Sequence, residues 1–135
     1  MSEPRLIRLS HIRRFDANGL VNLNLFDGEA FFGRLLCLEP GQQVPVHTHE
    51  HKDECFDVVE GEGTLLAGGQ EYRAGPGTTL YVPAHVRHGL RADGPARWVL
   101  RETVNERVYA RRALALAGRA ILKRLKLARD ETENQ

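Results

Sequence analysis

The middle of the chain, from about residue 31 to 104, consists of short segments in which apolar and polar residues alternate. Turn residues separate these segments, as at Gly68-Gly69 and Asp93-Gly94-Pro95. Alternation with a period of two is typical of strands with one buried face, whereas helices repeat about every 3.6 residues. The pattern predicts an antiparallel barrel or sandwich, with one hairpin around residues 68–69 and another around residues 93–95.

Residues 1–30 are predicted to form N-terminal strands or an arm. Leu6, Ile7 and Leu9 suggest a short strand. A clearer strand is predicted over residues 20–26, because turn signals stand on both sides of an alternating segment. Its even-numbered residues should face one way and its odd-numbered residues the other.

The pattern changes after the predicted barrel of residues 31–104. Residues 105–129 are rich in alanine, leucine, arginine and lysine, and their apolar positions recur at helical spacing. An amphipathic helix is therefore expected there, followed by a polar, disordered tail over residues 130–135. The apolar stripe of this helix would pack on the barrel or on a second subunit. Alternatively, its basic face would attach to an acidic membrane surface or to nucleic acid.

Composition narrows the class of protein. The 135 residues suit one domain, with 41% hydrophobic and 27% charged residues and a net charge of +1, which argues against a dedicated nucleic-acid binder. The chain shows no apolar run of membrane-spanning length and no signal peptide. Cys37 and Cys55 form no disulfide framework and are expected to be small buried hydrophobes, so a cytoplasmic location is predicted.

Four residues of ligand type fall in two separate predicted strand segments. His47 and His49 are two apart, so on a strand both imidazoles point the same way, roughly 6 to 7 Å apart at Cα. Glu54 opens the next strand, and His88 lies in a second strand-and-turn segment. Three neutral imidazoles and a carboxylate suit one divalent Fe, Mn, Ni, Co, Cu or Zn ion rather than Ca or Mg.

The spacing of these residues resembles the cupin superfamily. Gly41, five residues, His47, one residue, His49, four residues, Glu54, six residues and Gly61 are similar to its first motif. Gly77, five residues, Pro83 and then His88 are similar to its second, which departs from the family where His85 replaces a usual glycine and Ala92 a common asparagine. The resemblance implies an all-β fold, a double-stranded β-helix (the cupin or jelly-roll barrel), in which the three histidines and the glutamate bind a divalent metal.

An open metal position permits several functions. A redox-active metal could bind a substrate together with dioxygen, whereas a redox-silent metal could polarise a carbonyl and support isomerisation or decarboxylation. We expect a metalloenzyme of the dioxygenase or isomerase type that acts on a small oxygenated molecule. The alternatives are a non-catalytic cupin that binds or senses a small ligand, and an interaction protein with a structural metal. A homodimer through an edge strand or the terminal helix is also expected.

Residues other than the metal ligands are candidates for catalysis or substrate contact. His85, His51 and Tyr81 are the catalytic candidates, because two of them are further histidines near the site. A surface or core role is the alternative for each of them. Four more residues are candidates for contacts with a substrate, with a surface cation or core aromatic as the alternative: Arg34, Arg91, Trp98 and Arg101. For Arg34 the two interpretations are an anion anchor in the pocket and an outward arginine on an edge strand.

Overall fold

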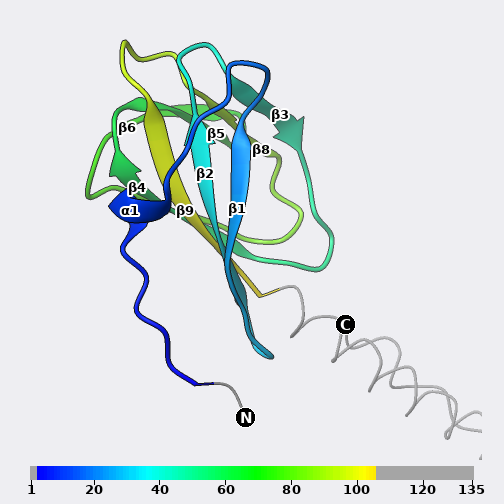
Figure 1. Ribbon diagram of the computed structural model, residues 1–135. Coiled ribbons are helices and arrows are strands. Elements are labelled where there is room, and N and C mark those ends of the chain that lie inside the picture. Colours follow the sequence, from blue (N-terminus) through cyan, green and yellow to red (C-terminus); the bar gives the residue numbers. More distant parts are fainter. Residues whose placement is uncertain (1–2, 106–135) are drawn as a thin grey trace, which may run out of the picture.

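The computed structural model describes residues 3–105, which form two facing antiparallel β-sheets (Figure 1). Along the chain the elements are α1 (Leu9–Ile12), β1 (Val21–Asp27), β2 (Phe32–Leu38), β3 (Gln43–His47), β4 (Glu54–Glu60), β5 (Gly63–Ala67), β6 (Gln70–Ala74), β7 (Thr79–Val82), β8 (His88–Arg91) and β9 (Trp98–Val104). No described helix is long and apolar enough to cross a membrane. The helix predicted for residues 105–129 and the tail after it lie outside the described residues, save Asn105.

Strands that follow one another along the chain often lie in different sheets. The alternation of apolar and polar residues within each strand does not predict this order. The five-stranded sheet has the order β1-β2-β9-β4-β7 and the four-stranded sheet the order β3-β8-β5-β6. The hairpin predicted around residues 68–69 is confirmed, because β5 pairs with β6. The hairpin predicted around residues 93–95 is wrong: β8 and β9 belong to different sheets. Backbone hydrogen bonds from Ala92 to Gln42 and from Gly41 to Ala92 tie the end of β8 to the start of β3 instead.

The main core lies between the two sheets. Glu54, Phe56 and Val58 alternate along β4 and are all buried, so they share its inward face. The apolar side chains of this core come from both sheets. They line the inner faces of the barrel, and the histidines lie at one end of the same space. The apolar core residues are Leu36, Leu38, Phe56, Val58, Leu65, Ala74, Val82, Leu90, Ala92, Trp98 and Leu100.

A second apolar cluster covers the part of the outer face of the five-stranded sheet that β1, β2 and the start of β9 form. Leu25, Leu35, Cys37 and Val99 are buried there under apolar residues of the N-terminal segment, which crosses this face (Figure 1). The short strand predicted at residues 6–9 is wrong, and a single helical turn, α1, follows instead. The reason is tertiary: the outward side chains of β1 and β2 are apolar, so burying the segment's side chains against them outweighs edge pairing.

The strand predicted over residues 20–26 is confirmed as β1, and its two faces separate as expected. Leu20 packs against the core between the sheets, whereas Val21 and Leu23 join the outer cluster. The alternation breaks at a bulge between Asn24 and Phe26, after which Phe26 also packs outward. An extra residue in one strand reverses the faces that follow it.

Candidate metal centre

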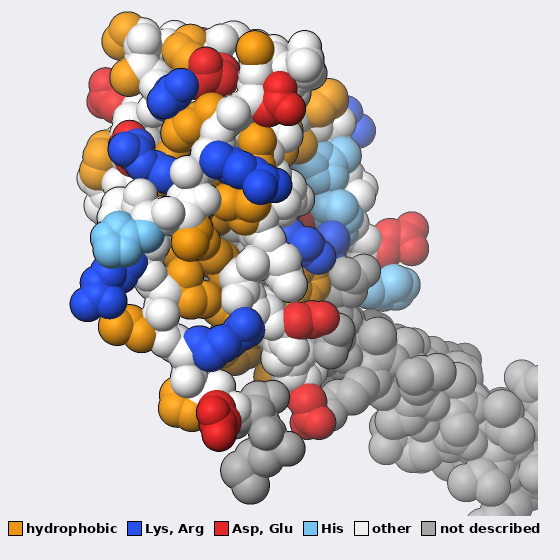
Figure 2. Space-filling model, viewed as in Figure 1, with side chains coloured by type: hydrophobic (Ala, Val, Ile, Leu, Met, Phe, Trp, Pro, Cys, Tyr) orange, Lys and Arg blue, Asp and Glu red, His pale blue; other side chains and the backbone are white. Residues whose placement is uncertain are grey.

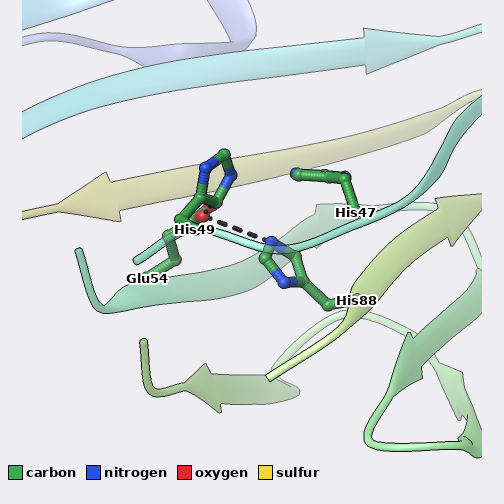
Figure 3. Close-up of side chains that lie close together, drawn as sticks. All are labelled: His47, His49, Glu54 and His88. Carbon is green, nitrogen blue, oxygen red and sulfur yellow. Dashed lines mark ion pairs between the residues drawn. The ribbon is translucent and has the colours of Figure 1, made fainter. Parts of the chain in front are cut away.

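Four polar side chains converge at one end of the space between the sheets. His47 ends β3, His49 follows two residues later, Glu54 begins β4 and His88 begins β8. Their ligand atoms all lie within 4.8 Å of one another. Figure 3 shows the three imidazoles and the carboxylate pointing toward a common centre, and in Figure 2 histidine side chains gather at the margin of the molecule beside β3.

An irregular pairing of β3 with β8 brings two of these histidines together. Val44 pairs with Leu90, but the register shifts by one before His47 pairs with His88. Pro45 lies in the shifted stretch, where a residue without an N–H suits an edge strand. Gly89 faces the bulge, and a Cβ there would lie 2.8 Å from the carbonyl oxygen of Val44. The absence of a side chain at residue 89 therefore permits the close approach of the two strands.

Backbone carbonyls orient two of the imidazoles. The Nδ1 atom of His47 lies 2.8 Å from the carbonyl oxygen of Pro45, and that of His88 lies 2.9 Å from the carbonyl oxygen of Val86. In a neutral imidazole, Nδ1–H donates such a bond and leaves the Nε2 lone pair free. The Nε2 atoms of His47 and His88 are thus prepared as ligands, which is the supporting arrangement commonly found around metal-binding histidines.

The polar atoms at the centre need a partner. Oε1 of Glu54 lies 3.0 Å from Nε2 of His49 and 3.2 Å from Nε2 of His88. Within the described part of the chain, however, Oε1 of Glu54 and Nε2 of His88 make no hydrogen bond of acceptable geometry, although both atoms are buried. Unpartnered buried acceptors are costly. A divalent cation is the partner that fits two facing lone-pair donors, so these residues fit a metal ion.

The electrostatics also favour an ionised ligand carboxylate. Burial acts to raise the pKa of Glu54, but polar contacts with His88 and Glu102 outweigh it and lower the pKa to about 2. Burial likewise acts to lower the pKa of His88, and its contacts with Glu54 and the Val86 carbonyl outweigh it and raise that pKa. For His49, burial prevails over the attraction of Glu54 and lowers the pKa. Glu54 is therefore a carboxylate at any pH near neutrality.

Glu102 is a further acidic residue at this site, and the motif-based prediction missed it. Burial, followed by a hydrogen bond and charge repulsion from Glu54, raises its pKa to about 8, so it holds a proton at neutral pH. The available signal was the alternation of residues 98–104, in which Trp98, Leu100 and Glu102 share a face. Only the pairing of β9 with β4, which places Glu102 beside Phe56, shows that this face meets the histidines.

A cavity of about 270 Å³ adjoins the cluster at His47 and His88. Its walls come from the inner faces of both sheets and include residues of the two edge strands β1 and β3. Apolar side chains dominate, with a few polar groups near the histidines, as is usual for small-molecule sites. The lining residues are Leu20, Asn22, Leu36, Val44, His47, Phe56, His88, Leu90 and Glu102.

The structure does not bring the three catalytic candidates to this cavity. The side chain of His51 is 74% exposed and lies beside Glu50. Tyr81 is 61% exposed. His85 is exposed as well; it has a φ of 73°, in the region that favours glycine, and its N–H donates to the carbonyl of His49. The last contact makes residue 85 part of the turn that supports the site.

Of the four candidates for substrate contact, three are either paired with carboxylates or buried in the core. Arg91 is paired with Glu71 and Asp93, and Arg101 with Asp57. Trp98 is fully buried in the core. Arg34 differs from these three. The prediction of an outward edge-strand arginine is wrong for it, because β2 lies between β1 and β9 and residue 34 shares the inner face of Leu36.

Sequence comparison agrees with the geometry. Residues 34–101, half of the chain, match the family model described as Cupin domain. The chain belongs to the cupin family. The stretch that matches this cupin model extends from β2 into β9 and includes all four converging residues.

Similar proteins confirm this fold. The crystal structure of TT1209 from Thermus thermophilus has a TM-score of 0.71 at 27% identity and covers 74% of this chain and 95% of its own. An RmlC-like cupin from Desulfovibrio desulfuricans has a TM-score of 0.65 at 27% identity, covering 78% and 97%. A putative sugar phosphate isomerase from Acidithiobacillus ferrooxidans has a TM-score of 0.59 at 29% identity, covering 63% and 58%.

One curated relative carries an enzymatic name. Quercetin 2,3-dioxygenase of Bacillus subtilis (strain 168) is 40% identical over 53 residues, which is 39% of this chain. The match spans only 16% of that protein. The likeness therefore concerns one segment of a much longer enzyme.

Proposed function

We propose that this cupin binds one divalent transition metal ion through His47, His49, Glu54 and His88. The observation that carries the proposal is the pair of buried, unpartnered atoms, Oε1 of Glu54 and Nε2 of His88, in a cluster whose ligand atoms lie within 4.8 Å of one another. Carbonyl contacts to Nδ1 of His47 and of His88 support it. When bound, the metal would supply Lewis acidity or a redox centre for a small oxygenated molecule.

The same proposal assigns an enzymatic role of the dioxygenase or isomerase type. The cavity of about 270 Å³ has room for a small molecule next to the ligand cluster. Phe56 and Leu90 give it an apolar inner wall, and Glu102 places a carboxyl group beside them on the face that meets the histidines. The names of the dioxygenase and isomerase relatives support these two reaction classes.

A non-catalytic, ligand-binding cupin is the second candidate. It is favoured by one observation: His51, Tyr81 and His85 do not line the cavity. Turnover separates the two functions. Dioxygen consumption with quercetin and interconversion of aldose and ketose phosphates are the two assays to run on metal-loaded protein, and binding without turnover across such substrates favours the second candidate.

A homodimer in the cytoplasm is part of this proposal. Cys37 and Cys55 are both free thiols in the structure, which suits a reducing compartment. Among residues 3–105, the edge strands β1, β3, β6 and β7 each pair with another strand on one side only, so each could pair with a second copy.

Metal analysis of the purified protein tests the ligand assignment. We expect close to one transition-metal ion per chain after reconstitution, and a loss of that metal when His47 and His49 are both changed to alanine. His51→Ala is the matched control, because His51 has the same spacing but is 74% exposed, and it should retain the metal. A wild-type protein that cannot be loaded, or a double variant that stays loaded, would contradict the proposal.

A further inference from the structure

A row of side chains crosses the inner face of the five-stranded sheet next to the metal centre. In register across β1, β2, β9 and β4 stand Asn24, Arg34, Glu102 and Phe56. Glu102 and Phe56 line the cavity described above, and so do Asn22 and Leu36, which occupy the inward positions next to Asn24 and Arg34. Arg34 therefore borders the wall of the cavity on the same face as its lining residues.

Arg34 differs from the other arginines of residues 3–105 in lacking an ion pair while being partly buried. Arg13, Arg73, Arg91, Arg97 and Arg101 each form an ion pair with a carboxylate. The remaining ones are exposed: Arg5, Arg8, Arg14 and Arg87.

Within residues 3–105, the contact that orients the Arg34 guanidinium is a cation–π contact rather than an ion pair. It lies over the ring of Phe32, 4.8 Å from the ring centroid. Stacking of this kind orients a guanidinium group but leaves its N–H donors free, and a desolvated cation without an anion is costly. Asn24 beside it adds a side-chain amide that can also donate a hydrogen bond.

We propose that Arg34 is the anion-binding residue of this cavity and that the molecule bound there carries a carboxylate or phosphate group. The inference rests on the proposed function, because it places the other end of that molecule at the metal centre. β2 lies two strands from β4, which is about 10 Å, so the anionic group is separated from the metal-facing atoms by a few bonds. Arg34 is a specificity residue in this arrangement, since it recognises charge at a distance from the metal.

Matched five-carbon and four-carbon acids test the inference. Isothermal titration calorimetry on metal-loaded protein would compare glutarate and 4-phosphonobutanoate, which carry a second anionic group, with pentanoate, which does not. We expect at least one of the two to bind about tenfold or more tightly than pentanoate. Glutarate as the tighter ligand indicates a carboxylate, and 4-phosphonobutanoate a phosphate.

Substitution of Arg34 tests whether this residue causes the preference for an acid with a second anionic group. Arg34→Met should remove it while changing pentanoate binding little, and Arg34→Lys should retain part of it because the charge remains. Arg101→Met is the control: it deletes an arginine from the neighbouring strand β9, where the side chain points outward and pairs with Asp57. This control should bind all three acids like the wild type. Thermal unfolding of each variant shows that the fold is intact.

The outcomes separate this inference from the metal assignment. Metal content is measured first in every sample. A loaded protein that shows no preference for either dianion, or whose preference survives in Arg34→Met, overturns the role of Arg34 and leaves the metal centre standing. A protein without metal that still shows the Arg34-dependent preference supports Arg34 and contradicts the metal assignment.

Discussion

At the scale of single residues, two carboxyl groups at one site have opposite states. Glu54 and Glu102 share a hydrogen bond, yet the pKa of Glu54 is lowered to about 2 and that of Glu102 is raised to about 8. Glu54 is buried and Glu102 is half-buried, and burial acts to raise both pKa values, so the difference comes from their neighbours. Imidazoles surround Glu54, whereas Glu102 meets chiefly the charge of Glu54. One carboxylate is thus available as a ligand and one neutral acid as a hydrogen-bond donor.

The raised pKa of Glu102 predicts the pH dependence of stability in the protein stripped of metal with EDTA. Unfolding lets Glu102 ionise at its ordinary pKa, near 4.5, whereas the folded state keeps its proton up to about 8. The stability contributed by this proton is full below pH 4.5 and is lost as the pH rises through 8. Glu102→Gln cannot ionise and should avoid that loss, since its amide still donates to Glu54.

Thermal unfolding of both proteins between pH 5 and pH 8.5 measures the effect. The melting temperature of Glu102→Gln relative to the wild type should rise across this range by about 4 °C or more, the shift that roughly 1 kcal/mol produces in a domain of this size. A difference that stays constant with pH would mean that Glu102 ionises normally in the folded state.

At the scale of elements, the pairing of β3 with β8 determines the geometry of the centre. The shift between Val44 and His47 places His47 opposite His88, and Gly89 accommodates the displaced strand. Without the extra residue, His47 would face the other way, because one step of register exchanges the two faces of a strand. The bulge is therefore a functional feature of the strand rather than an irregularity.

Gly89→Ala should weaken metal binding without removing any ligand. The new Cβ would lie 2.8 Å from the Val44 carbonyl oxygen, so β3 must move away from β8 and carry His47 from His88. Displaced supporting groups commonly cost 10- to 100-fold in metal affinity, and about tenfold or more is expected here, measured by competition with a chelator.

Gly19→Ala is the control for this substitution, because a Cβ at residue 19 meets no atom within 4 Å. It should bind metal like the wild type. Equal affinities of Gly89→Ala and the wild type would show that β3 and β8 can separate without moving the ligands.

At the scale of the whole molecule, one sheet has two apolar faces. Its inner face helps to enclose the cavity, and the part of its outer face formed by β1, β2 and the start of β9 is buried beneath Ile7, Leu9 and Phe15. This covering explains how Cys37 is completely buried although it lies on the side of the sheet away from the main core. The segment from Ile7 to Phe15 is thus part of the folded domain.

Thiol labelling tests this covering. Burial raises the pKa of both Cys37 and Cys55, but only Cys55 is partly exposed, so Cys55 should react first with N-ethylmaleimide at pH 8.5. Changing Leu9 and Phe15 together to serine should speed labelling of Cys37 about tenfold or more, as followed by mass spectrometry of peptides.

Leu6→Ser provides the comparison, because Leu6 is 81% exposed. It should leave the protection of Cys37 unchanged. Rapid labelling of Cys37 in the wild type would show that the N-terminal segment does not protect the outer face of the sheet.

The sequence by itself determined the class of fold and the group of residues that converge. Alternation along short segments identified the β-structure, and the spacing of His47, His49, Glu54 and His88 within recognisable motifs selected those that the structure brings within 4.8 Å. These features are local, because each depends on neighbours along the chain or on the near-fixed geometry of a strand. They could therefore be read without knowing which strands pair.

Only the tertiary structure decided which residues join them. Glu102 and Arg34 stand in segments where apolar and polar residues alternate, as many other residues of this chain do. Their place beside the site follows from the order β1-β2-β9-β4 and its register. The same order separates β8 from β9, which are neighbours in the chain, and carries the N-terminal segment onto the outer face. Strand order depends on burial across the whole domain, a balance of distant contacts that no single segment of the chain contains.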